Sequence, residues 1–552
     1  MSRMKIGVAL LSLALAAAAC AGSPGRDTAR PGPPTTSEPA GDGGTLVVRS
    51  AGEPGCFDWL APCGTGLAAP IRNLILPQTV AFVGGKYVPT PLLTGEPVQD
   101  FGPPHRLTYK LNPRAVWSDG VPITSSDLRY TWDQAAHAPG IRNRTGFEQI
   151  ESVDDSDPQT AVITFKQPYA AWYNPFGTLQ NIFPKHLLEG KDRTAEMKDG
   201  HSWSGGPWKL DRWVKGQEIR FVPNPNYWGP KPHLDALVYR TIPDAGAALA
   251  AYRSGQVSLL QGVPPEVTLA ELQALPDTTV ETTENLAVQQ MLLNTQRAPL
   301  DTVAVRQALA HATDREALVR HAFTLLKPDI KPIQALMTRV NGSWYIEPFA
   351  RYRRDLSRVE QLMRGAGWER GTDGIWTKGE QRAQLDVLGL AGNKSVQLQE
   401  EILQSQWKEA GFEMKVSNVS NQATLLRQGA FHVSFSTASF TNDDPSRCAL
   451  LCSRNVPTEA NGFGGENLAR VADPAHDAAW DRVNNELQPT RRMEALKAAY
   501  EITATLVPFL PTAPGLSLLV YNSSRLAGVR NDGGPTGPFF DTTTWFCRAG
   551  RC

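Results

Sequence analysis

Apolar and polar residues follow different patterns in the two halves of the chain. In the first half, short stretches of alternating character stand between turn clusters such as Asp119-Gly120 and Asn224-Pro225-Asn226, which is typical of strands joined by tight turns. The predicted strands are Leu46–Arg49, Leu107–Leu111, Ala161–Phe165, Glu218–Val222 and Leu237–Arg240. This half is therefore expected to be rich in strands.

The pattern changes near Gln289. Residues 290–293 read as a buried strand, and residues 303–323 as one helix with Val305, Ala308, Leu309 and Ala312 on a single face. Further helices are predicted at Leu356–Ala366, Val396–Ala410 and Arg491–Ala504, and strands at Ala383–Val387, Met414–Val419, His432–Ser436 and Ser517–Val520. The fold class is therefore α/β in two lobes, and a cleft between the lobes is the natural ligand site.

The N-terminus carries an export signal. Arg3 and Lys5 precede the apolar run Ile6–Ala19, which is too short to span a bilayer comfortably and so reads as a signal peptide, residues 1–19. Ala17-Ala18-Ala19-Cys20 resembles the bacterial lipobox, although Ala17 stands where Leu is usual. The resemblance implies a lipid, palmitate included, on Cys20. The alternative is an ordinary secretory signal with Cys20 incidental.

Residues 20–44 after the signal are rich in Pro, Gly, Ser and Thr. This composition cannot bury enough apolar surface to order itself, so it predicts a flexible tether. No later segment approaches 18 consecutive apolar residues. The expected location is outside the cytoplasm, anchored to the bacterial cell membrane by the N-terminal lipid.

Charge and cysteine content narrow the function further. Lys plus Arg equals Asp plus Glu at 55 each in 552 residues, with no basic stripe, so nucleic acid is not an expected partner. The other cysteines form close pairs that predict disulfides in an exported protein: Cys56/Cys63, Cys448/Cys452 and Cys547/Cys552. A metal site is the alternative, but these spacings without a neighbouring His suit zinc poorly.

The sequence gives no support for catalysis. It lacks His-Glu-x-x-His, Gly-x-Ser-x-Gly and the phosphate-binding Gly-x-x-x-x-Gly-Lys-Ser/Thr motif. No two of the nine His residues stand at i, i+4 spacing, so no metal or cofactor is expected. A secreted hydrolase with an unrecognised site remains an alternative, as does an extracellular sensing or interaction lipoprotein without a transport role.

Three groups of motifs follow one another along the chain. The first is Val116-Trp117-Ser118-Asp119-Gly120 with Thr124-Ser125-Ser126-Asp127-Leu128; the second is Gly205-Gly206-Pro207-Trp208 with Asn224-Pro225-Asn226-Tyr227-Trp228-Gly229; the third is Asn294-Thr295 with Val305-Arg306-Gln307-Ala308-Leu309 and Asp314-Arg315-Glu316-Ala317-Leu318. Together they resemble the family 5 extracellular solute-binding proteins of ABC importers, the peptide-, dipeptide- and nickel-binding type. The resemblance covers nearly the whole mature chain.

The resemblance implies a fold and a role. The fold is the periplasmic-binding-protein type II architecture in its large family 5 variant, with a hinged inter-lobe cleft. Lobe I would span residues 45–286 with an inserted subdomain around 80–200, lobe II 287–514, and residues 515–552 would return to lobe I, with crossings near Leu286–Leu293 and Pro511–Leu519. A monomer would close on an oligopeptide, dipeptide or related small solute and deliver it to permease subunits served by a separate ATPase.

The resemblance also implies ligand-binding residues on one wall of the cleft. Phe57, Gly64 and Thr65 occupy the positions after the first strand, beside Cys56/Cys63. The alternative is that Phe57 and Thr65 only pack or cap this loop. Asn294, in the third motif group, is also assigned to the ligand site.

The opposite wall departs from the family pattern. Peptide binders of the family often carry Trp-x-x-Asp-x-x-Asp/Glu-Pro, whose first Asp pairs with the amino terminus of the ligand. Here Ala438 stands at the Trp position and Thr441 at that of the Asp, while Asp444-Pro445 keeps the end of the motif. A buried ammonium group would lack its partner unless Asp443 or Asp444 substitutes. The missing Trp leaves room for a longer or modified peptide.

Overall fold

The computed structural model describes residues 43–66, 69–141, 144–177, 179–262, 269–392, 394–440 and 444–552. Residues 40–552 form one compact unit. Within the described ranges, no helix is both long enough and apolar enough to cross a membrane. Cys20, and with it the predicted signal peptide and most of the tether, lies outside the described residues.

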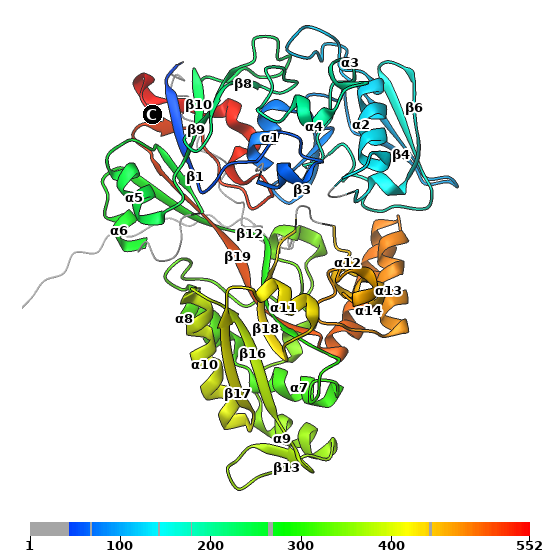
Figure 1. The fold of residues 1–552 in the computed structure, drawn as a ribbon, viewed down its shortest axis with the longest axis vertical. Coiled ribbons are helices and arrows are strands. Elements are labelled where there is room, and N and C mark those ends of the chain that lie inside the picture. The colour runs from blue at the N-terminus through cyan, green and yellow to red at the C-terminus, as the bar shows by residue number, and fades with distance from the viewer. Residues whose placement is uncertain are drawn as a thin grey trace, which may run out of the picture. The chain divides into compact units, whose positions relative to one another are not determined.

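A ten-stranded mixed sheet runs through this unit, with its strands in the order β17-β16-β18-β12-β19-β11-β1-β10-β9-β8 (Figure 1). Its strands are β1 (Thr45–Ser50), β8 (Trp208–Val214), β9 (Glu218–Pro223), β10 (Ala236–Thr241), β11 (Leu259–Gln261), β12 (Thr278–Leu293), β16 (Gln384–Leu390), β17 (Glu413–Val419), β18 (Val433–Ala438) and β19 (Phe509–Asn522). Every strand expected from the alternating pattern in this sheet is present.

The long strands β12 and β19 connect the two halves of the sheet. They pair antiparallel from Thr278↔Asn522 to Leu292↔Phe509, and the register is irregular between Glu284 and Val288. We use this irregularity to define a first lobe, residues 43–284 with 515–552, and a second lobe, residues 288–514. The crossings expected from the sequence lie within these two strands.

The first lobe adds a second sheet and a hairpin to its part of the large sheet. Strands β4 (Val98–Asp100), β5 (Arg106–Lys110), β6 (Ile150–Asp157) and β7 (Thr160–Phe165) form a sheet in the order β4-β5-β7-β6, and α2 (Ser125–His137) packs on β6. Strands β2 (Val80–Val83) and β3 (Lys86–Pro89) form the hairpin. The remaining elements of the lobe are α1 (Ala69–Ile75), α3 (Lys185–Leu188), α4 (Arg193–Glu196), α5 (Ala245–Arg253), α6 (Leu269–Gln273), β20 (Leu526–Ala527), β21 (Phe546–Cys547) and the 3-10 helices η1 (Pro62–Gly66), η2 (Phe147–Gln149), η7 (Gly537–Thr544) and η8 (Arg548–Gly550).

Helices pack around the sheet of the second lobe. They are α7 (Val303–Ala312), α8 (Arg315–Phe323), α9 (Leu356–Gly365), α10 (Lys394–Ala410), α11 (Gln422–Gln428), α12 (Cys448–Leu451), α13 (Pro474–Asn485) and α14 (Pro489–Leu506), with the 3-10 helices η3 (Arg339–Trp344), η4 (Pro348–Arg351), η5 (Ser453–Asn455) and η6 (Glu459–Asn461) and a small sheet of β13 (Glu369–Arg370), β14 (Trp376–Lys378) and β15 (Gln381–Arg382). The apolar face of α10 puts Leu403 and Trp407 into the core, as expected.

The single helix predicted over residues 303–323 is wrong, because the structure has two helices there. Thr313 takes an extended conformation, φ −99° and ψ 117°, which ends α7. Asp314 then accepts a hydrogen bond from the backbone N–H of Ala317 and so caps α8. An Asp at a capping position is a helix start signal, and a prediction from apolar periodicity alone does not take it into account.

The three predicted disulfides, Cys56–Cys63, Cys448–Cys452 and Cys547–Cys552, are confirmed. The side chain of Asp481 lies close to the second pair. Because both sulfur atoms of that pair are engaged with each other, they are not available as metal thiolates.

Candidate functional site

A cavity of about 750 Å³ lies between the lobes. Its first-lobe wall comes from the segments around η2 and after β7, and its second-lobe wall from the end of β18, α12 and α13. The lining residues include Glu148, Gln149, Gln167, Tyr169 and Asn174 on one side, and Ser439, Phe440, Asp444, Arg447, Asp481 and Asn484 on the other. A cavity of this size with mixed polar and apolar walls suits a small solute.

One hydrogen-bonded cluster joins the two walls. The hydroxyl group of Tyr173, in the first lobe, donates to Oδ2 of Asp444 at 2.7 Å. In the second lobe, Nη2 of Arg492 on α14 donates to the same oxygen, also at 2.7 Å. All three side chains are buried. Within this cluster, the ion pair lies in the second lobe, and the hydrogen bond from Tyr173 is the contact that crosses between the lobes.

Neighbouring groups hold this cluster in place. The backbone N–H of Ser446 donates to Oδ1 of Asp444 at 2.8 Å, which fixes the carboxylate against its own chain. Nε of Arg492 donates to the carbonyl of Val483 at 2.8 Å, and its guanidinium group lies 5.5 Å from the centroid of the Trp344 ring. Both charged residues therefore have partners on several sides.

Burial and pairing act in opposite directions on the ionisation of the pair. Burial by itself would raise the pKa of Asp444, but the charge and hydrogen bond of Arg492, with the hydrogen bonds from Tyr173 and Ser446, lower that pKa below its usual value. Burial would likewise lower the pKa of Arg492, and the nearby Asp444 raises it instead. The two side chains therefore form a buried ion pair at neutral pH.

The other charged groups around the cavity differ in their partners. Arg454 pairs with Asp481 on α13, with Nη1 3.2 Å from Oδ2. The guanidinium group of Arg447 lies 3.8 Å from the centroid of the Phe440 ring. The exposed carboxylate of Glu148, on the first-lobe wall, has no ion pair among the residues that the structure describes. The cavity is thus polar: neutral amide groups, the buried guanidinium group of Arg447 and the exposed carboxylate of Glu148 all line it.

A smaller cavity of about 230 Å³ adjoins the same cluster. Tyr87, Trp172, Tyr173, Trp344 and Arg492 are among the residues that line it. The rings of Tyr87 and Tyr173 stack with their centroids 3.7 Å apart. This aromatic floor extends the inter-lobe site from the polar cavity toward the β2–β3 hairpin.

The residues predicted from the sequence are only partly at this site. Asp444 lines the cavity, and Ala438 ends β18 next to the lining residues Ser439 and Phe440. Thr441 and Asp443 lie outside the described residues, as does the side chain of Thr65.

The other three predicted residues have packing roles and do not line the cavity. Phe57 is fully buried with its ring 5.3 Å from that of Trp213, which agrees with the packing alternative. A Cβ on Gly64 would come within 2.1 Å of the carbonyl oxygen of Asp58, so this glycine permits close backbone contact. Asn294 is buried, and its Nδ2 donates to the carbonyls of Gly429 and Phe431.

Two residues that complete the site, Tyr173 and Arg492, were not predicted from the sequence. Tyr173 and Arg492 lie 271 and 48 residues from Asp444 along the chain, so no local motif connects them. For Arg492 there was a partial signal in the sequence, since it lies in the helix predicted after Pro489. An Arg that such a helix buries needs a carboxylate partner.

Residues 102–456 match the sequence profile of the bacterial extracellular solute-binding proteins, family 5 (middle part). The chain belongs to this family. Its membership confirms a solute-binding protein that acts outside the cytoplasm as part of ABC transport, rather than an enzyme.

Individual proteins are similar to this chain in sequence or in fold. The chain is 27% identical over 447 residues to Protein XP55 of Streptomyces lividans, covering 78% of each chain. It is 25% identical over 448 residues to the oligopeptide-binding protein AppA of Bacillus subtilis, covering 77% of this chain and 78% of AppA. The solved periplasmic EDTA-binding protein EppA has the same fold, with a TM-score of 0.81 at 20% identity, covering 93% of this chain and 98% of that one.

Proposed function

We propose that this protein is the lipid-anchored receptor of an ABC importer that captures a peptide or a related small polar solute between its lobes. The observation that carries the proposal is the 750 Å³ cavity whose walls come from both lobes. Bound solute would be delivered to permease subunits, and a separate ATPase would drive import. The protein would act as a monomer.

Hinge closure is the proposed mechanism. The lobes are joined by β12 and β19, and the irregular register between Glu284 and Val288 gives these strands a point at which to bend. Ligand stabilises the closed state only through contacts that the open state lacks. Tyr173 and Asp444 supply one such inter-lobe contact without ligand, so closure is partly built into the protein.

The arrangement of charges favours a particular class of peptide. Asp444 is engaged with Arg492 and Tyr173, so it is not available to the ammonium group of a ligand in this conformation. Side-chain amides such as Gln149, Asn174 and Asn484 line the cavity and suit the backbone of a bound peptide. The proposed ligand is a peptide whose amino terminus is blocked, modified or placed away from Asp444; a free amino terminus inside the cavity would have to pair with Glu148 on the opposite wall.

Relatives support this class of ligand. The solved structure of AppA from Bacillus subtilis, at 20% identity and a TM-score of 0.72, holds a nonapeptide. That of EppA carries the name of an EDTA-binding protein, so the same fold accommodates non-peptide polyacids. A chelate or another polar solute is the second candidate.

The decisive experiment identifies the natural ligand. The protein is purified from its native host and the co-purified compound is identified by native mass spectrometry, then tested by calorimetry beside its N-acetylated or de-acetylated form. We expect acetylation to change the affinity of a peptide ligand by less than about tenfold, since one neutral hydrogen bond contributes about 0.5–1.5 kcal/mol. A much larger loss on acetylation would contradict the proposed ligand class, and cleavage of the compound would contradict the receptor function.

Two further experiments test the anchor and the transport role. Cys20→Ser should abolish palmitate labelling and move the protein from the membrane fraction to the medium or periplasm. Deleting the gene should abolish uptake of the identified compound. Unchanged uptake would favour the alternative, an extracellular sensing lipoprotein.

A further inference from the structure

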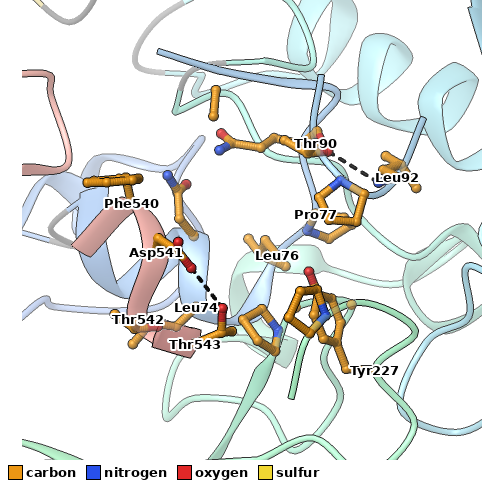
Figure 2. A pocket seen from close by; sticks show the side chains of 18 of the residues that line it. Leu74, Leu76, Pro77, Thr90, Leu92, Tyr227, Phe540, Asp541, Thr542 and Thr543 are labelled. Carbon is orange, nitrogen blue, oxygen red and sulfur yellow. Dashed lines mark hydrogen bonds between the residues drawn. The ribbon is translucent and has the colours of Figure 1, made fainter. Parts of the chain in front are cut away.

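A second cavity, of about 380 Å³, lies entirely within the first lobe. It is enclosed by the end of α1 with the loop that follows, one face of the β2–β3 hairpin, the Asn224–Gly229 turn region and η7 near the C-terminus. Figure 2 shows Leu76, Tyr227, Phe540 and Thr543 around the same space. These segments are distant in sequence, so the cavity is formed by the tertiary fold of one lobe.

The β2–β3 hairpin separates this cavity from the inter-lobe site. Ala81 pairs with Val88, and both line the first-lobe cavity. Phe82 pairs with Tyr87, which faces the other way and stacks on Tyr173 beside the inter-lobe cluster. Because neighbouring residues of a strand point to opposite faces, one hairpin forms a wall of both sites while keeping them separate.

The walls of the first-lobe cavity are largely apolar. Leu74, Leu76, Leu92 and Phe539 are buried side chains, and several prolines with Tyr227 and Trp228 complete the lining. The indole N–H of Trp228 is already engaged with the carbonyl of Pro91 at 3.2 Å. The cavity therefore has the size and the apolar character of a small-molecule pocket.

The one carboxylate in the lining does not attract a cation. Oδ2 of Asp541 lies 2.7 Å from Nη2 of Arg530, and Oδ1 accepts a hydrogen bond from the hydroxyl group of Thr543, also at 2.7 Å. The dashed line between Asp541 and Thr543 marks this bond in Figure 2. With its charge paired, this residue leaves the cavity close to neutral.

The polar groups that remain are hydrogen-bond donors. The oxygen of the Asn73 side chain accepts from Nδ2 of Asn181 at 3.0 Å, and that of Gln78 accepts from the N–H of Leu179 at 3.4 Å. Each residue thus keeps its NH₂ group, for which no hydrogen bond is found among the described residues. The same holds for the hydroxyl group of Tyr227. Burial raises the pKa of Tyr227 to about 12, so this hydroxyl group stays protonated and can donate.

We propose that the first-lobe cavity is a second binding site, for a neutral and largely apolar molecule that carries a hydrogen-bond acceptor such as a carbonyl oxygen. The apolar walls would enclose the body of the molecule, and the donors of Tyr227, Asn73 and Gln78 would orient its acceptor. This site is distinct from the inter-lobe cavity and does not depend on the proposed transport function.

The test uses the full-length protein and prodan, a neutral fluorescent naphthalene with a ketone acceptor. Saturable binding is expected, with the blue-shifted emission of an apolar site. Ala81→Phe fills the cavity from the hairpin and should weaken binding at least tenfold. Val98→Phe makes a similar enlargement at a 63% exposed position of β4 and should leave binding unchanged.

Two further variants locate the site and its chemistry. Tyr227→Phe removes one donor with minimal change of shape and should weaken prodan binding about fivefold. This variant tests the site even if Ala81→Phe fails to fold. Tyr173→Phe, in the inter-lobe cluster, should leave prodan binding unchanged. The proposal is overturned if Ala81→Phe and Tyr227→Phe both bind prodan like the wild type, if Tyr173→Phe abolishes binding, or if the anionic dye 1-anilinonaphthalene-8-sulfonate competes for this site with equal affinity.

Discussion

Tyr173 and Asp444 join the two lobes through a single hydrogen bond of 2.7 Å between a phenol and a buried carboxylate. The two residues are 271 positions apart in the chain. Arg492 neutralises the carboxylate from within the second lobe, so the phenol meets an ion pair rather than an isolated charge. This contact crosses between the lobes and makes several properties of the cleft testable.

Tyr173→Phe should weaken closure without altering the fold of either lobe. A hydrogen bond to a charged group contributes about 1.5–3 kcal/mol, so the co-purified solute should dissociate at least tenfold faster. Stopped-flow dilution measures this rate. Tyr252→Phe is the matched control, because its hydroxyl group lies 3.2 Å from Oγ1 of Thr278 within the first lobe, and it should dissociate ligand like the wild type. Equal rates for both variants would refute the role of Tyr173.

Arg492→Met should destabilise the second lobe strongly. Removing one partner of a buried ion pair leaves an uncompensated charge and costs about 3–5 kcal/mol in the free energy of unfolding. The double variant Asp444→Leu/Arg492→Met should recover a large part of this loss, since no buried charge remains. Chemical denaturation checks both. Lys185→Met, which breaks an exposed pair with Glu189, should change stability by about 0.5 kcal/mol or less.

The ion pair of Asp444 and Arg492 also predicts that the stability of the protein depends on pH in acid. The pKa of Asp444 is lowered in the folded protein, so its contribution to stability is present at pH values above its unfolded pKa of about 4 and is lost as the pH falls through the lowered folded value. Arg492→Met should remove this part of the acid sensitivity. An unfolding midpoint that falls equally in the variant and the wild type would contradict the assignment.

Gly515 lies where β19 faces the irregular part of β12. A Cβ at this position would come within 2.3 Å of Oδ1 of Asn285 and 2.6 Å of Cβ of Ala287. Gly515→Ala should therefore cost about 1–3 kcal/mol and change the inter-lobe angle, measured as the radius of gyration by small-angle scattering. Gly365→Ala is the control, because its added Cβ would meet no atom within 4 Å apart from its chain neighbours and the nearby backbone of its own helix. An unaltered radius in Gly515→Ala would show that this position does not control the hinge.

His476 on α13 predicts a loss of stability in mild acid. Burial lowers its pKa to about 4 in the folded protein, whereas the unfolded value is about 6.5. The unfolded chain therefore binds the extra proton between these values, and stability falls as the pH drops from about 6.5 to about 4, by about 3 kcal/mol at most. His476→Gln should flatten this part of the stability profile. A slope equal to that of the wild type would contradict this prediction.

Some features of the fold followed directly from local sequence. Alternating apolar residues located β1, β5, β7 and β9, because neighbouring side chains of a strand point to opposite faces. A continuous apolar run located β10, which buries four residues in a row. Close cysteine spacing predicted the disulfides, since short loops bring such pairs within bonding distance. The motif groups placed the chain in its family. The break at Asp314 was missed because helix periodicity continued across a capping residue.

What the sequence by itself determined was therefore the family, the two-lobed α/β class and the local elements, all of which depend on residues near one another in the chain. Only the tertiary structure decided which side chains share a cavity. It brought Tyr173, Asp444 and Arg492 into one cluster, buried Phe57 and Asn294 away from the cleft, and formed a separate apolar cavity behind the β2–β3 hairpin. The physical reason is that a binding site depends on distances between segments far apart in sequence, and no spacing rule along the chain specifies those distances.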